Sequence, residues 1–125
     1  IVIATCALLL RIVIDRVIKI NIAQNESTAQ GTLKFIATAL ENYSNDNRGG
    51  YPEDLSLLTK PSPPYLDKDY ITQSPFKGYN YSCLRLEASG YDCSAQPARC
   101  KLSGNLVYNI TTGGILASEE CNKKE

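Results

Sequence analysis

The first 45 residues constrain the fold more than any other stretch, because they contain almost nothing that ends a helix. Between Ile1 and Asn45 there is no proline and one glycine, Gly31, and the next helix-ending signal is the run from Asn47 to Gly50. A stretch of this kind predicts one continuous helix. At 1.5 Å per residue, this helix would be roughly 65 to 70 Å long. The 80 residues that follow are too few to surround it, so we expect one end to protrude.

The protruding end is predicted to be the N-terminal one, because that end is apolar. The first ten residues, Ile1 to Leu10, carry no charge, and the apolar run resumes after Arg11. A helix that crosses a bilayer needs about 20 apolar residues, so this one is short for a span unless further apolar residues precede Ile1. The absence of methionine fits a processed or incomplete chain. A cleaved signal peptide is the alternative, but no small-residue cleavage site follows.

Charged residues in the predicted protruding half are spaced one helical turn apart. Arg11, Asp15 and Lys19 follow one another at steps of four, and Arg16 lies one position over. Pairs at this spacing stabilise a helix in water by about a few tenths of a kcal/mol each. In lipid or in a packed helical core they would matter more, because unpaired charge is costly there. Two interpretations stay open: a solvated face just outside a membrane, and pairing between helices of neighbouring subunits.

From Asn25 onward the helix is predicted to be amphipathic. Apolar side chains recur at steps of three and four residues, at Ala29, Leu33, Ile36, Leu40 and Tyr43. This pattern predicts that the second half of the helix lies across a sheet. We therefore divide the chain into a protruding assembly or transmembrane half-helix, residues 1–24, and a head, residues 25–125.

The head is predicted to add a small antiparallel sheet to the helix. After a loop over residues 48–78, the sequence predicts strands at 79–83, 90–95, 105–110 and 115–117, followed by a C-terminal tail. The expected fold class is α+β: a long N-terminal helix with a protruding apolar half, and three or four strands packed on its C-terminal half. The sheet face that covers the helix is expected to consist of Tyr79, Tyr81, Tyr91, Leu106, Tyr108 and Ile115.

The composition argues against several functional classes. The chain has 13 basic and 13 acidic residues and no basic cluster, so nucleic acid is not expected as its main partner. It has no histidine, which removes the commonest general base, and no nucleophile stands at motif spacing from a base. We therefore expect no enzyme, no cofactor and no metal site.

Cysteine usage indicates an oxidising compartment outside the cytoplasm. Four of the five cysteines lie in the predicted sheet half of the chain, as is usual in small domains with disulfides. Cys83 and Cys93 occupy facing positions of a predicted hairpin, so we expect a cross-strand bridge there. Cys100 would then pair with Cys121, although four cysteines allow three pairings. Cys6 is expected to be a small buried apolar residue.

Four Asn-x-Ser/Thr triplets are candidate glycosylation sites. They begin at Asn25, Asn42, Asn80 and Asn109. Such triplets also arise by chance, and their use depends on a glycosylation system that a sequence does not reveal.

The order of several motifs resembles that of the type IV pilins and the related pseudopilins. Ile1-Val2-Ile3-Ala4 is similar to the middle of the family's opening motif, Phe-Thr-Leu-Ile-Glu-Leu-Leu-Ile-Val-Ile-Ala. Asn25-Glu26-Ser27-Thr28-Ala29 is similar to the family's Asn-Glu-Ala/Ser helix run, and Asp46-Asn47 before Gly50-Tyr51-Pro52 resembles its exit from the helix. Later landmarks are Pro64-Tyr65-Leu66, Gly78-Tyr79-Asn80-Tyr81 and the run from Tyr108 to Ile115. The resemblance covers nearly the whole chain.

The chain departs from the family pattern near its start. Several family residues would precede Ile1, among them the N-terminal Phe, which is usually methylated, and the Glu that guides assembly. Asp15 stands where these helices often carry a proline, which implies a more continuous helix than is usual in the family. The charges Arg11, Asp15, Arg16 and Lys19 are also more numerous than the family pattern.

The resemblance implies a structural subunit of an extracellular type IV pilus-like filament on the cell surface. Its expected partners are further copies of the chain in a helical filament, an inner-membrane pilus assembly machinery, and the inner membrane before assembly. Alternatives are a pseudopilin of a type II secretion system and a single-helix, membrane-anchored binding module. The residues expected to form the filament core are apolar and belong to the protruding half: Ile1, Val2, Ile3, Leu8, Leu9, Leu10, Ile12, Val13, Ile14, Val17 and Ile18.

Overall fold

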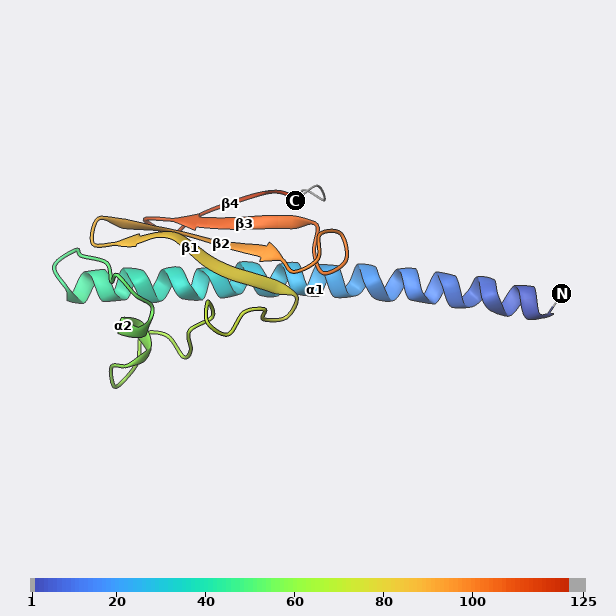
Figure 1. Cartoon of the computed structure of the whole chain (residues 1–125), viewed down its shortest axis with the longest axis horizontal. Coiled ribbons are helices and arrows are strands. Elements are labelled where there is room, and N and C mark those ends of the chain that lie inside the picture. The colour runs from blue at the N-terminus through green and yellow to red at the C-terminus, as the bar shows by residue number, and fades with distance from the viewer. Residues whose placement is uncertain (1, 122–125) are drawn as a thin grey trace.

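The chain folds as a long helix that carries a small head on its C-terminal half (Figure 1). This computed structural model describes the backbone of residues 2–121 and the side chains of residues 20–121. The helix α1 (Val2–Asp46) runs without interruption for 45 residues, as the proline-free sequence predicts. Its N-terminal half extends beyond the head as a single rod (Figure 1).

The end of α1 is fixed by a left-handed turn. Arg48 and Gly49 have φ values of 60° and 83°, and the Gly49 N–H donates to the carbonyl of Ser44 at 2.8 Å. Glycine reaches this conformation at little cost, which is why it commonly follows the last helical residue. The turn reverses the chain and sends it back along the helix.

The segment between helix and sheet covers one side of α1, opposite the sheet in the view of Figure 1. It contains one short helix, α2 (Ser56–Thr59). The remainder, up to Gly78, has no strand or further helix. Buried side chains attach this segment to the core at intervals: Pro52, Leu55, Leu58, Leu66 and Tyr70.

The sheet is an antiparallel meander of four strands in the order β1-β2-β3-β4. The strands are β1 (Tyr79–Glu87), β2 (Gly90–Pro97), β3 (Leu106–Thr111) and β4 (Ile115–Glu120). β1 and β4 extend four and three residues beyond the ends expected at positions 83 and 117. In the register, Tyr81 lies opposite Ala95, and Ala95 lies opposite Tyr108.

The core lies between one face of this sheet and the apolar stripe of α1. Ala29, Leu33, Ile36 and Leu40 are buried, as the three- and four-residue spacing predicts. They meet tyrosines of the inner sheet face, which are also buried: Tyr79, Tyr81, Tyr91 and Tyr108.

The expectation that Ile115 belongs to this inner face is wrong. Ile115 is 65% exposed, whereas its neighbour Leu116 packs against the core. Leu116 lies opposite the buried Ile110 in the register. Because side chains alternate between the faces of a strand, a shift of one residue moves the apolar side chain to the other face.

Candidate assembly site

The protruding half of α1 is the part of the chain that the sequence predicts to assemble. Its backbone is helical from Val2 onward. Ile1 lies outside the described residues, and the predicted core residues from Val2 to Ile18 and the charged residues Arg11, Asp15, Arg16 and Lys19 lie outside the described side chains. The structure therefore leaves these assignments as predictions. Within the described residues, no helix is long and apolar enough to cross a membrane.

The first side chain of α1 that the structure shows buried against the head is Ile22, which is 8% exposed. Ile20, on nearly the opposite side of the helix, is 56% exposed. On the next turn, the Asn25 side-chain amide donates to the Ser103 carbonyl at 3.0 Å, and the Glu26 carboxylate accepts from the Asn105 N–H at 3.1 Å. These two side chains attach α1 to the loop between β2 and β3, and so fix where the protruding half begins.

The β2–β3 loop is itself held in place at both ends. Cys100 forms a disulfide with Cys121, which follows β4. The Tyr79 hydroxyl donates to the Leu106 carbonyl at 2.7 Å, and its ring packs so closely on Gly104 that a Cβ atom there would lie 2.2 Å from the hydroxyl oxygen. Only glycine fits at this position without displacing the ring.

The second disulfide joins the first two strands. Cys83 and Cys93 lie opposite each other in the register of β1 and β2 and are bonded. Both disulfides are the pairs that the sequence predicts. The symmetry of the two cysteines about Ala88 predicts the β1–β2 bridge. In the structure the strands meet at Glu87 and Gly90, and a bulge between Cys83 and Arg85 brings Cys83 opposite Cys93.

A carboxylate near the C-terminal end of α1 connects three parts of the head. Glu41 accepts hydrogen bonds from the hydroxyls of Tyr51 and Tyr91, at 3.1 and 2.8 Å, and from the Gly113 N–H at 3.2 Å. The Tyr91 hydroxyl also accepts from the Gly114 N–H at 3.0 Å. Burial, together with the nearby carboxylate, raises the pKa of both tyrosines. The sequence pattern assigns Glu41 only to the polar side of the helix.

The structure separates the four candidate glycosylation sites into two groups. The amides of Asn25 and Asn109 are engaged, the first with Ser103 and the second with the Asp92 side chain and the Cys93 carbonyl. Asn42 on α1 and Asn80 on β1 are exposed. Of the four, only Asn42 and Asn80 therefore present a free side-chain amide to an enzyme that acts on the folded head.

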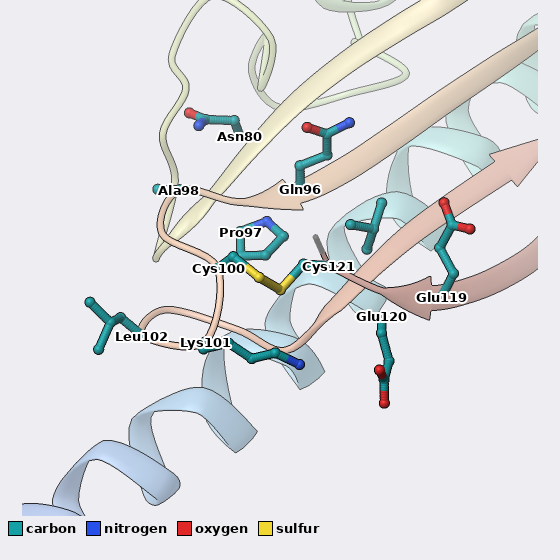
Figure 2. A pocket seen from close by; sticks show the side chains of 11 residues that line it. Asn80, Gln96, Pro97, Ala98, Cys100, Lys101, Leu102, Glu119, Glu120 and Cys121 are labelled. Atoms are coloured by element: carbon teal, nitrogen blue, oxygen red, sulfur yellow. A yellow bond between two sulfur atoms is a disulfide. The ribbon is translucent and has the colours of Figure 1, made fainter. Parts of the chain in front are cut away.

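The outer face of the sheet contains a hollow of about 970 Å³ beside the C-terminal disulfide. Figure 2 shows Cys100 and Cys121 at its floor, with Lys101 and Leu102 on the loop next to α1. Asn80 and Gln96 approach from one side and Glu119 and Glu120 from β4. Over the described residues, no cluster of His, Cys, Asp or Glu could hold a metal ion.

Comparisons with known proteins agree with this architecture. The sequence matches no protein-family model and none of the curated proteins. The structure is similar to the crystal structure of the non-core minor pilin PilV of Neisseria meningitidis, with a TM-score of 0.53 and 18% sequence identity. The similarity covers 84% of this chain and 92% of PilV. The chain therefore has a type IV pilin-like fold, and the protein it resembles is a pilin.

Proposed function

We propose that this chain is a structural subunit of an extracellular type IV pilus-like filament and polymerises through its N-terminal helices. The observation that carries the proposal is the shape of the chain. A head with a pilin-like fold sits on the C-terminal half of α1, while the other half extends beyond it (Figure 1). That extension is the most apolar part of the sequence. In water, such a surface is stable only when it is covered.

Packing of many parallel extensions explains why the product is a filament. The face that one copy presents differs from the face that receives it, so the contact repeats along a helical path without closing. If each copy buries about 600 Å² of apolar surface, the gain is on the order of 15 kcal/mol before the entropic cost of association. The expected packing residues are the apolar ones from Ile1 to Ile18.

Before assembly, the proposed location of the subunit is the inner membrane. There the apolar extension lies in lipid. An inner-membrane pilus assembly machinery then extracts the subunit from the membrane and adds it to the growing filament. The two disulfides fit a head that folds in an oxidising compartment. In the filament, Asp15 would pair with one of Arg11, Arg16 and Lys19 of a neighbouring helix, because unpaired charge in a packed core is costly. The role is structural, and no reaction is assigned to the chain.

Electron microscopy with a helical reconstruction of native material tests the proposal. We expect thin fibres with a core of packed helices into which these side chains fit. Leu9→Asp and Ile12→Asp should abolish the fibres and leave the head folded. Leu84→Asp is the matched control, because Leu84 is 87% exposed on the head and should tolerate a charge. Fibres of normal length from the Leu9 and Ile12 variants would contradict the proposal.

The same experiment separates the two alternatives. A pseudopilin of a type II secretion system would give only short periplasmic assemblies, and their loss would stop secretion. A membrane-anchored binding module would appear as dispersed or micelle-bound monomers, without repeating contacts along α1.

A further inference from the structure

Three basic residues belong to the two loops at the end of the head where α1 leaves it. Lys77 belongs to the turn before β1, and Arg99 and Lys101 belong to the β2–β3 loop. The Ala98 N–H donates to the Gly78 carbonyl at 2.8 Å, which joins the two segments. With the exposed Leu102, we call these residues the basal cluster: Lys77, Arg99, Lys101 and Leu102.

The basal cluster contains no ion pair within the described residues; the Lys77 ammonium lies 5.5 Å from the centre of the Phe76 ring, and Lys101 is half-buried. Leu102 is 56% exposed, and Lys77 and Arg99 are also exposed. Across residues 20–121, the structure contains one ion pair, Arg85 with Glu87. The carboxylate of the nearby Glu26 accepts a hydrogen bond from the Asn105 N–H. Glu119 and Glu120 of β4 line the same hollow as Lys101 and Leu102, but neither forms an ion pair with Lys101.

The backbone at two of these cations is itself unfavourable for a side chain. Lys77 and Lys101 have φ values of 48° and 71°, in the left-handed region that glycine and asparagine occupy more easily. Arg48 in the turn after α1 has the same conformation, so the argument for the two lysines rests on their charge and position.

A cluster of opposite charge lies at the other end of the head. Glu53 and Asp54 are exposed directly before α2, and Leu57 on α2 is 41% exposed. We call Glu53, Asp54 and Leu57 the distal cluster. Pro52, Leu55 and Leu58 are buried around it, so its backbone is held rigidly. Figure 1 places α2 near the C-terminal end of α1 and the β2–β3 loop near the other end of the head.

We propose that the basal cluster of one copy binds the distal cluster of a second copy along the filament. The inference rests on the proposed function and names the contact between heads. Copies with parallel helices are related by a shift along the filament axis, which moves the base of one head toward the far end of another. The two clusters are complementary, because each combines an exposed leucine with charges of one sign, positive at the base and negative at the far end. Because the two surfaces differ, the contact repeats without closing.

Charge reversal and charge exchange test this contact in cells that assemble the wild-type chain. Arg99→Glu with Lys101→Glu should reduce filaments per cell at least tenfold, and Glu53→Lys with Asp54→Lys should do the same. The chain with all four substitutions should recover filaments to within about threefold of wild type, since the attraction is restored with its sign exchanged. Lys34→Glu is the control for charge changed elsewhere on the head, because Lys34 is exposed on α1 outside both clusters, and it should leave assembly unchanged.

Normal filaments from either reversed pair, or no recovery in the fourfold variant, would overturn the inference. The second result would assign the basal cations to another partner, such as an anionic membrane surface. A carbodiimide that joins lysines to carboxylates gives an independent measurement on the wild-type chain. We expect dimers that link Lys77 or Lys101 to Glu53 or Asp54, and dimers without these links would refute the contact. Absence of any wild-type filament would instead refute the proposed function.

Discussion

Two buried tyrosines on the same sheet face should respond in opposite ways to the loss of their hydroxyls. Tyr91 and Tyr81 are both almost completely buried, and Phe at either position keeps the ring. The Tyr91 hydroxyl donates to Glu41 and accepts from the Gly114 N–H. The Tyr81 hydroxyl is buried and makes no hydrogen bond of good geometry, although the buried Thr32 side chain lies close to it; burial raises the pKa of Tyr81, and Thr32 offsets part of that rise. Comparing the two variants therefore separates the contribution of the hydrogen bonds to the free energy of unfolding from the contribution of the buried ring.

The magnitude for Tyr91→Phe follows from the two hydrogen bonds that are lost. A hydrogen bond to a charged acceptor contributes about 1.5 to 3 kcal/mol, and one between neutral groups contributes about 1 kcal/mol. Glu41 keeps its contacts with Tyr51 and Gly113, and Gly114 is exposed so that water can replace the hydroxyl there. We therefore expect Tyr91→Phe to lower the free energy of unfolding by about 2 to 3 kcal/mol.

For Tyr81→Phe the expected change has the opposite sign. A buried hydroxyl without a partner is itself destabilising, because it has given up its hydrogen bonds to water. Its removal should leave the free energy of unfolding unchanged or raise it by about 1 kcal/mol.

Urea unfolding of both variants and the wild type, followed by circular dichroism with the disulfides intact, measures these changes. For a head of this size, 1 kcal/mol corresponds to a shift of about 4 to 8 °C in Tm, so thermal unfolding should place Tyr91→Phe at least 8 °C below Tyr81→Phe. Equal losses in the two variants would show that the Glu41 network contributes nothing beyond the packing of the rings.

Two further predictions concern the core. Gly104→Ala should destabilise the head by about 1 to 3 kcal/mol, because the new Cβ would meet the buried Tyr79 ring. Gly31→Ala should stabilise the head by about 0.5 to 1 kcal/mol, because its Cβ meets nothing within 4 Å. Equal changes in the free energy of unfolding, measured in urea, would contradict this prediction. Burial raises the pKa of Tyr70 to about 12 and raises those of Tyr79 and Tyr91, so the folded head keeps protons that the unfolded chain loses near pH 10. Stability from these groups should be complete below pH 10 and should fall as the pH rises toward 12 and above, and a Tm that stays constant from pH 9 to 12 would contradict the burial of these hydroxyls.

Much of the fold was predictable because it depends on local patterns. The continuous helix follows from the absence of proline, and the buried stripe from Ala29 to Leu40 follows from its spacing. The hairpin that joins Cys83 to Cys93 follows from two strand patterns on either side of a turn composition, although the pairing of the cysteines also needs the bulge between Cys83 and Arg85. Apolar burial is not directional, so a periodic pattern is enough to identify the buried face.

The contacts that fix the head on the helix were not predictable in the same way. Glu26, Gln30 and Glu41 have the spacing of a polar helix surface, yet each one binds the head: Glu26 the Asn105 N–H, Gln30 the Tyr108 hydroxyl, and Glu41 two tyrosines and Gly113. Their partners lie up to 79 residues away in the sequence. No local pattern encodes such a pairing, because it depends on the register of the strands.

The sequence by itself determined that a long helix with one apolar end carries a small disulfide-linked sheet, because periodicity, proline content and cysteine spacing are properties of neighbouring residues. The tertiary structure decided that Leu116, and not Ile115, faces the core, and that Asn25 and Glu26 attach the helix to the β2–β3 loop. It also placed the basic residues Lys77, Arg99 and Lys101 around the base of the head. Hydrogen bonds and charge clusters need defined directions and distances, and these exist only after strand register and packing bring distant segments together.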